Sequence, residues 1–306
     1  MKLSMRRGIL AIFLAGLVVV IAGGIAVRAH AARQPVTLTF TSFDYPGAKS
    51  TYATAINNAG VIVGYYTDAS NNYYGFTYTG STFTSLSFTG FVNTQIWGIN
   101  DSGEVVGFYT IEMNEIVYTL GFSYTSSGGF VTVAYPGAVV TSAYGINNAG
   151  EIVGIWVDDA LNTHGFTLVS GVYTSFDYPG SKITYAYGIN NAGEISGLTI
   201  DGCCVFNGFT LTGGIGGTFT EISYPGGKED STGVLKINDN AQLVGYFYPT
   251  KGVGVRGFAN AGSRYASFVD SGSPTEATGI NNAANIVGAY GTSEVTHGFL
   301  AVPSTQ

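Results

Sequence analysis

The sequence predicts an all-β fold, a six-bladed β-propeller with four-stranded antiparallel blades, and three observations support this prediction. First, the motif Gly-Ile-Asn-Asn-Ala-Gly-Glu-Ile-Val-Gly at 145–154 returns five more times in recognisable form. Second, Thr, Tyr, Phe and Val alternate with Gly, Asn and Ser turns, which is typical of strands. Third, Gly supplies 45 of 306 residues and only 10% are charged, as suits short strands joined by tight turns.

The spacing of the motif indicates the size of one repeat. Its Ile recurs every 43 to 48 residues, at positions 56, 99, 146, 189, 237 and 280. In the third copy we predict four strands, labelled a to d, over 141–147, 151–157, 164–168 and 172–177. The sixth copy lacks a strand d, and the segment 36–45 resembles one, because it leads into the same Phe-Asp-Tyr-Pro-Gly sequence. We expect this strand to complete the last blade, so that 32–306 forms one closed domain.

The first 31 residues are predicted to be an export signal. Lys2, Arg6 and Arg7 precede an apolar run over 8–27, and residues 29–31 read Ala-His-Ala, the small-x-small pattern of a cleavage site. The run is also long enough for an uncleaved membrane anchor. Under both alternatives the domain is exported, either to the periplasm and cell envelope or to the extracellular space.

Charge narrows the class of partner. The chain has 12 basic and 19 acidic residues, a net charge of −7. The first 31 residues hold four basic and no acidic ones, so 8 and 19 remain afterwards, a net charge of −11. Nucleic-acid binding depends on clustered Lys and Arg, which are scattered here. We therefore expect a glycan or an extracellular protein as partner, no nucleic acid, and membrane contact only through a retained N-terminal segment.

Several motif positions have a structural explanation. Asn follows the Ile in every copy, where its amide can satisfy backbone groups of the turn between strands a and b. The Gly three residues later would supply a positive φ, but Ala241 and Ala284 replace it in two copies. Those turns either bear a strain of about 1 kcal/mol or adopt another shape. We expect the Gly that closes the motif to mark close packing by a neighbouring blade, and small residues to line the innermost strand.

The core I-N-N-x-G-x-I-V-G, followed by His-Gly-Phe at 164–166 and 297–299, resembles the extracellular HAF repeats of bacteria. The resemblance covers nearly the whole exported domain. It implies an exported, propeller-like repeat protein and brings no established reaction or catalytic residues. The His is dispensable to a blade, because the other four copies replace it with Tyr74, Leu120, Asn207 and Arg256.

The loops differ between the two faces of the predicted propeller. The loops from b to c and from d to a open on one face, and the a-to-b turns on the other. From the closing Gly to the Gly before Phe the separations are 11, 14, 11, 11, 12 and 10 residues, whereas the a-to-b turns keep one length. Binding usually lies on variable loops of a constant scaffold. Our ligand-binding candidates on this variable face are Asp68, Tyr73, Glu112, Glu115, Trp156, Asp201 and Glu294.

Carboxylates on the same face suggest a second hypothesis, a site for Ca²⁺ or another hard cation. Its candidate ligands are Asp44, Asp158, Asp159 and Asp177. The spacing of a calcium loop is missing, so a solvated rim of loops explains the same residues and no other cofactor is expected.

The most enzyme-like set is Asp158, Asp159 and His164, because a carboxylate pair beside an imidazole can exchange protons with a substrate. An ordinary strand residue is the competing explanation, since His164 occupies a repeat position that His297 shares. No nucleophile-elbow or zinc-protease motif accompanies the set.

Cys203 and Cys204 are the only cysteines, and they are adjacent in an exported chain. A bridge between neighbours is strained, so a vicinal bridge, an intermolecular bridge and free thiols all stay open. Two adjacent thiolates do not provide the ligands of a zinc site.

Three functions remain open from the sequence. The leading one is a noncatalytic propeller that binds a glycan or a protein through the variable face. The second is a hydrolase or lyase that acts on polysaccharide, and the third is an inert structural protein of the envelope. Nonrepeated polar side chains that converge at the mouth of the central channel would mark a site.

Overall fold

The computed structural model describes residues 37–304, apart from 87, 89–91, 202–204, 252–253, 263, 270–272 and 293. The predicted export segment and both cysteines lie outside the described residues. Every regular element in the described part is a β-strand, which confirms the all-β prediction. Within the same residues, no helix has the length and apolar character needed to cross a membrane.

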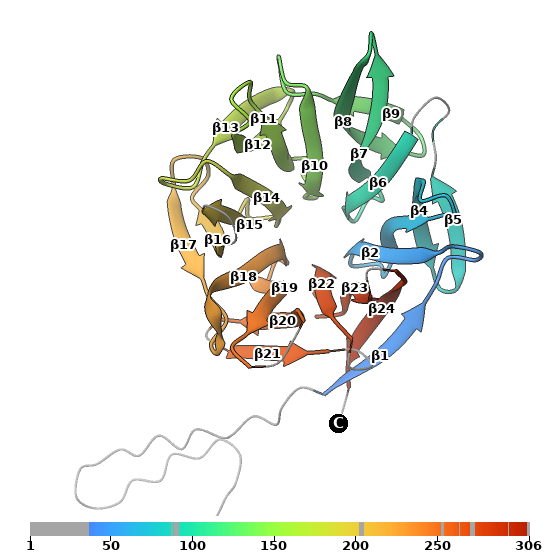
Figure 1. Ribbon diagram of the computed structural model, residues 1–306, viewed down its shortest axis with the longest axis vertical. Coiled ribbons are helices and arrows are strands. Elements are labelled where there is room, and N and C mark those ends of the chain that lie inside the picture. Colours follow the sequence, from blue (N-terminus) through green and yellow to red (C-terminus); the bar gives the residue numbers. More distant parts are fainter. Residues whose placement is uncertain are drawn as a thin grey trace, which may run out of the picture. The chain divides into compact units, whose positions relative to one another are not determined.

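The strands form four sheets of four, eight, eight and four strands, and the antiparallel pairs within these sheets divide the strands into six groups of four (Figure 1). Group 1 contains β2 (Ser50–Ile56), β3 (Ile62–Thr67), β4 (Tyr73–Thr79) and β5 (Thr82–Leu86), and group 2 contains β6 (Val92–Ile99), β7 (Val105–Met113), β8 (Ile116–Thr125) and β9 (Gly129–Val133). Group 3 contains β10 (Val140–Ile146), β11 (Ile152–Val157), β12 (Thr163–Val169) and β13 (Val172–Phe176), and group 4 contains β14 (Thr184–Ile189), β15 (Ile195–Asp201), β16 (Val205–Thr212) and β17 (Thr218–Ile222). Group 5 contains β18 (Gly227–Ile237), β19 (Gln242–Pro249), β20 (Arg256–Ala261) and β21 (Arg264–Phe268), and group 6 contains β22 (Thr275–Ile280), β23 (Ile286–Gly291), β24 (Thr296–Pro303) and β1 (Leu38–Phe43). Parallel pairing of β8 with β10 and of β16 with β18 joins two groups in each eight-stranded sheet.

Strand boundaries follow the repeat closely. In group 3 each of the four strands begins and ends within one residue of its predicted limits. β1, the first strand of the chain, pairs antiparallel with β24, the last, from Leu38 opposite Pro303 to Phe43 opposite Gly298. Sequence-distant ends of the chain therefore share one sheet.

The core lies between neighbouring groups. The first strand of each group, strand a, is innermost, and the groups surround a common axis (Figure 1). The Phe that follows Gly in strand c is fully buried in all six groups, at positions 76, 122, 166, 209, 258 and 299. Phe166, for example, packs with Ala143 and Ile152 of its own group and with Val106 of the preceding one. Burying such aromatic side chains is the main apolar contribution to stability.

The motif turns have the geometry that the sequence predicts. Asn147 Oδ1 accepts hydrogen bonds from the backbone N–H groups of Ala149 and Glu151, each at 3.0 Å. Gly150 has a φ of 78°. Ala241 and Ala284 keep the same conformation, with φ of 54° and 60°, so these two turns take the strained alternative.

The closing Gly of the motif is required for a different reason from the one predicted. A Cβ on Gly154 would lie 2.0 Å from the carbonyl oxygen of Ser142, which belongs to strand a of the same group. Strand a bulges between Ala143 and Gly145, and this bulge presses its backbone against strand b. The expected approach of a neighbouring blade at this glycine is therefore wrong. That approach occurs at Gly145, whose added Cβ would lie 3.0 Å from Tyr187 O in group 4.

Substituting the closing glycine should therefore be far more damaging than substituting the turn glycine. We expect Gly154→Ala to destabilise the protein by about 3 kcal/mol or more, because backbone atoms must move. Gly150→Ala should cost about 1 kcal/mol, the strain of a positive φ that Ala241 and Ala284 already bear. Urea unfolding of both variants measures the difference, and equal costs would contradict the assigned close approach.

Candidate functional site

The motif Asn side chains join the six groups into a closed ring. Asn147 Nδ2 donates to the carbonyl oxygen of Asn190 in the next group at 3.2 Å. The equivalent bond occurs at all six junctions, at 2.9–3.3 Å. The bond from Asn281 Nδ2 to Asn57 O spans 224 residues and connects group 6 to group 1. Sequence reasoning found the turn role of these residues and missed this role between groups.

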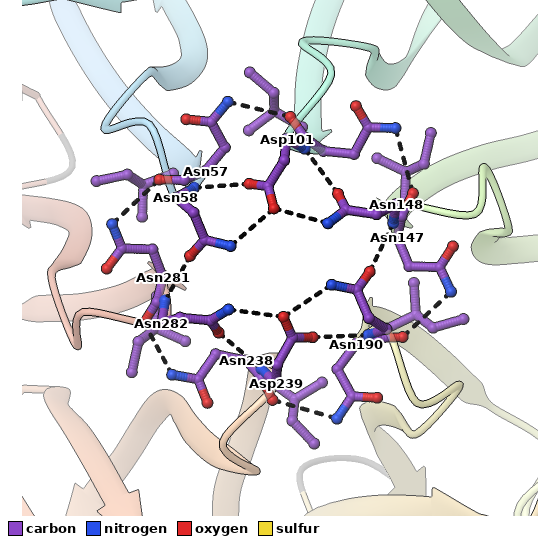
Figure 2. Close-up of a pocket in the computed structure, with 18 residues that line it drawn as sticks. Asn57, Asn58, Asp101, Asn147, Asn148, Asn190, Asn238, Asp239, Asn281 and Asn282 are labelled. Carbon is purple, nitrogen blue, oxygen red and sulfur yellow. Dashed lines mark hydrogen bonds between the residues drawn. The ribbon is translucent and has the colours of Figure 1, made fainter.

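A second ring lies inside the first and lines a cavity at the face of the a-to-b turns (Figure 2). Its members are the residues after each motif Asn, which are Asn58, Asp101, Asn148, Asn191, Asp239 and Asn282. Each backbone N–H donates to the side-chain Oδ1 of the next group at 2.8–3.0 Å. Asp101 Oδ2 also accepts from Asn58 Nδ2 and Asn148 Nδ2, and Asp239 makes the matching pair of bonds. Burial alone would raise the pKa of Asp101, but these hydrogen bonds lower it. The polar atoms satisfy one another, so we assign this cavity to the scaffold.

A lysine occupies the next layer of the axis. A second cavity is lined by the motif Ile and the residue before it in all six groups. The preceding residue is Gly in four groups and Ala55 in group 1, but it is Lys236 in group 5. Lys236 Nζ donates to Tyr144 O at 2.5 Å and to Tyr187 O at 2.7 Å. Burial lowers the pKa of this lysine to about 7.

Aromatic side chains fill the axis on the other side of Lys236, toward the start of strand a. Trp97 lies at their centre, with its ring centroid 5.2 Å from Tyr144, 5.9 Å from Tyr65 and 6.3 Å from Tyr187. Continuous ring contacts define an axial aromatic cluster of Tyr52, Tyr65, Tyr73, Trp97, Phe108, Tyr144, Tyr185 and Tyr187. These side chains come from groups 1 to 4, and all except the buried Tyr144 are half-exposed. The cluster lies at the end of the axis nearest the d-to-a loops.

The expectation that small residues line the innermost strand is correct only in part. Alternate positions along a strand face opposite sides. In β10, the fully buried Ala143 packs in the core with Phe166, whereas its neighbour Tyr144 joins the axial aromatic cluster. Small residues are needed where groups meet, and the axis accommodates large ones.

Glu276 adds a carboxylate to the cluster. It lies on β22, four residues before the motif Ile, and its side chain is exposed. Burial nevertheless raises its pKa, because protein surrounds the carboxylate while solvent reaches it along the axis. Burial raises the pKa values of Tyr65, Tyr187 and Tyr246, and the nearby charge of Glu276 raises them further. These phenols therefore stay protonated at neutral pH and can donate hydrogen bonds.

The sequence candidates for ligand binding do not form one site. Tyr73 reaches the axial aromatic cluster, with its ring 5.8 Å from Tyr65. Trp156 lies away from the axis, stacked on Tyr135 at 4.2 Å and on His164 at 4.5 Å. Four of the five acidic candidates are exposed and lie on three hairpins, with Glu112 and Glu115 on the β7–β8 hairpin, Asp201 at the end of β15 and Glu294 between β23 and β24.

Asp68 and Asp158 have the same structural role in two groups. Asp158 Oδ1 accepts from the N–H groups of Ala160 and Asn162, and its Oδ2 accepts from Asn162 Nδ2. The hydrogen bond from the Asn162 side chain is the largest cause that lowers the pKa of Asp158 to about 2. Asp68 caps its own b-to-c turn in the same way, with Asn72 as partner. Turn geometry accounts for both carboxylates.

The enzyme-like set is only partly assembled. His164 Nδ1 lies 2.8 Å from Asp177 Oδ1, and its Nε2 lies 3.3 Å from Asp158 Oδ2. Asp159 is exposed at the turn. His164 lies on strand c, the third strand outward from the axis, and Asp158 and Asp159 lie on the turn between strands b and c.

The His–Asp pair also belongs to the repeat. In group 6, His297 Nδ1 lies 2.9 Å from Asp44 Oδ2, the same arrangement as His164 with Asp177. Three of the four predicted cation ligands are thus engaged by histidines, Asp44 by His297 and both Asp158 and Asp177 by His164. Across the described residues, no three His, Cys, Asp or Glu side chains gather in a way that could hold a metal ion.

No protein-family model and no curated protein matches this sequence. A variant of the Aleuria aurantia lectin in complex with Fucα1-6GlcNAc is similar in structure, with a TM-score of 0.52 and 14% identity over 84% of this chain and 97% of that one. That lectin has been described as a six-bladed β-propeller. The chain folds as a β-propeller. A Trypanosoma rangeli sialidase in complex with 2,3-difluorosialic acid also matches this propeller, with a TM-score of 0.51 and 9% identity over 83% of this chain and 54% of that one.

Sequence reasoning missed Trp97, Lys236 and Glu276. A signal for Lys236 and Glu276 exists in the aligned motif copies. Lys236 stands where the other copies have Gly or Ala, and Glu276 stands where they have Tyr, Gln, Ser or Gly. Residues of the innermost strand that differ from the other copies of the repeat identify the axial site, which a comparison of the loops alone does not.

The buried lysine should make stability depend on pH in a defined window. Its ordinary pKa of 10.5 falls to about 7 on folding, so between these values the unfolded chain binds a proton that the native state lacks. Stability should then rise with pH, by about 1.4 kcal/mol per pH unit at most. Lys236→Met removes this term, so the variant should be more stable than the unsubstituted protein below pH 7, and the advantage should shrink toward pH 9. Urea unfolding at pH 6, 7, 8 and 9 measures it, and parallel curves for the two proteins would contradict the assignment.

Proposed function

We propose that this protein is an exported, six-bladed β-propeller that binds a glycan without modifying it. The axial aromatic cluster, together with Glu276, forms the binding site. The sequence predicts binding somewhere on the variable face, and this proposal restricts the binding site to the part of that face around the axis. One observation carries the proposal, which is the convergence of half-exposed aromatic and nonrepeated polar side chains from several groups on one axis.

The chemistry of these side chains suits a sugar. Aromatic faces such as that of Trp97 can cover the C–H faces of a pyranose ring, and phenol groups can hydrogen-bond its hydroxyls. The pKa values of Tyr65 and Tyr187 are raised, mainly by burial, so both hydroxyls remain available as donors. A half-exposed apolar surface with a few polar groups is typical of small-molecule sites.

The six-bladed architecture is supported by the six strand groups and by the ring of Asn hydrogen bonds. The pairing of β1 with β24 supports closure of the ring by the N-terminal strand. The fold shared with a lectin solved in complex with Fucα1-6GlcNAc makes glycans the first class of ligand to examine. Fold alone does not transfer a ligand from one propeller to another.

Three alternatives make different demands. A polysaccharide hydrolase commonly uses two carboxylates that flank the bond to be cleaved, and Glu276 is one carboxylate at the axis. An exported protein as partner would use exposed loop residues such as Glu112, Glu115 and Glu294. An inert envelope protein would bind neither class of ligand.

The chain has two tryptophans, and they provide a matched test of the site. Trp97→Ala should weaken binding to any glycan found in an array screen by tenfold or more, because truncating a central aromatic contact removes much of the binding energy. Trp156→Ala should leave binding unchanged, since Trp156 stacks on Tyr135 away from the axis.

Titration calorimetry with the bound glycan measures both variants, and an assay for new reducing ends tests the catalytic alternative. Equal loss in both variants, or loss only in Trp156→Ala, would place the site elsewhere. Release of reducing ends by the unsubstituted protein would overturn the noncatalytic proposal.

A further inference from the structure

Glu276 is a carboxylate without a partner of its own. Among the described residues, no hydrogen-bond donor and no cation is paired with it, although it lies in the innermost layer of the fold. The corresponding residues in groups 1 and 4 are Tyr52 and Tyr185, so the repeat does not require an acid here. An unpaired charge that protein surrounds is destabilising unless something pairs with it.

The surroundings of Glu276 are aromatic. Its charge acts on the phenols of Tyr65, Tyr187 and Tyr246, which come from groups 1, 4 and 5. Trp97 contacts both Tyr65 and Tyr187, at 5.9 and 6.3 Å between centroids. Aromatic faces carry partial negative charge and attract cations that lie over them. The carboxylate and the aromatic side chains would therefore both attract a positively charged ligand.

Lys236, a positively charged residue of the described inner strands, is engaged elsewhere. In its own group, Lys236 stands three residues closer to the motif Ile than Glu276 does in group 6. Three residues of a β-strand extend about 10 Å. Its ammonium group donates to the carbonyl oxygens of Tyr144 and Tyr187, and burial holds its pKa at about 7. Lys236 therefore does not neutralise Glu276, and it is partly uncharged at neutral pH.

We propose that the axial site recognises an organic ammonium group, which Glu276 pairs with and which the faces of Trp97, Tyr65 and Tyr187 surround. This inference takes the location of the site from the proposed function and adds the charge of the ligand. Two sources provide the chemistry, the protonated amine of an amino sugar and a quaternary ammonium such as choline. A glycan with free amino groups combines the ammonium with sugar faces that the same aromatic side chains cover.

The experiment uses the full-length chain with Trp156→Phe, which leaves Trp97 as the only tryptophan and as a fluorescent reporter at the axis. Three probes are titrated, which are choline, a trimer of glucosamine and the neutral N-acetylated trimer. We expect the glucosamine trimer to bind at least tenfold more tightly than its N-acetylated form. Choline should change the Trp97 emission, because a desolvated cation over an aromatic face interacts strongly.

Glu276→Gln on the same background removes the charge and keeps the shape. It should weaken binding of both ammonium probes by tenfold or more and leave the neutral trimer unaffected. Asp177→Asn, which neutralises a carboxylate on the outer side of the molecule, is the matched control and should change none of the three. Glu276→Tyr installs the residue of groups 1 and 4 and provides a second variant should the glutamine variant be poorly folded.

The outcomes separate this inference from the proposed function. Tight binding of the neutral trimer, with no preference for ammonium and no effect of Glu276→Gln, would overturn the inference and leave glycan binding standing. Binding of choline but of neither trimer, lost in Glu276→Gln, would support the ammonium site and overturn the glycan. Ammonium binding that survives both Glu276 variants would overturn the assigned role of the carboxylate.

Discussion

The hydrogen bond from the motif Asn to the backbone of the next group is the interaction on which the structure depends. Asn147 satisfies the N–H groups of its own turn with Oδ1 and uses Nδ2 to reach Asn190 O. One side chain therefore specifies both the local turn and the contact between groups. Because the bond recurs six times and returns from Asn281 to Asn57, removing any one leaves buried polar groups unpaired at a junction.

Around this ring, positions on the innermost strand differ in how freely their side chains can be exchanged for others. Gly145 packs closely against group 4, whose backbone lies 3.0 Å from where its Cβ would be, and Ala55 and Lys236 are the two exceptions at this position of the repeat. Tyr144, one residue earlier, points to the axis and packs on rings from other groups. The scaffold is thus maintained by one set of residues, and the set that faces the axis can vary without disturbing it. Such separation is common where a rigid framework carries a variable site.

The sequence predicts the framework well and the site poorly, for one physical reason. Gly, Asn and Phe recur because each repeat meets the same local demand, so their spacing predicts the strands of group 3 to within a residue. The spacing predicts the wrong neighbour for Gly154, because it reveals that a backbone lies close but not which one. The axial residues arise from six separate segments that meet only in the folded chain. Glu276 and Lys236 are single exceptions within the repeat, and a search for motifs passes over exceptions.

Glu276 and Lys236, the two exceptions within the repeat, are also residues whose burial is unfavourable for the stability of the fold. Burial raises the pKa of Glu276 and lowers that of Lys236, so in both cases folding disfavours the charged form. Tyr or Ser at the first position and Gly or Ala at the second would avoid this penalty, as the other groups demonstrate. Local choices that conflict with the rest of a scaffold tend to mark functional sites. The two charges differ in consequence, because the carbonyl oxygens of Tyr144 and Tyr187 satisfy Lys236 internally while Glu276 faces solvent along the axis. Of the two, Glu276 is therefore the one whose penalty a ligand can relieve.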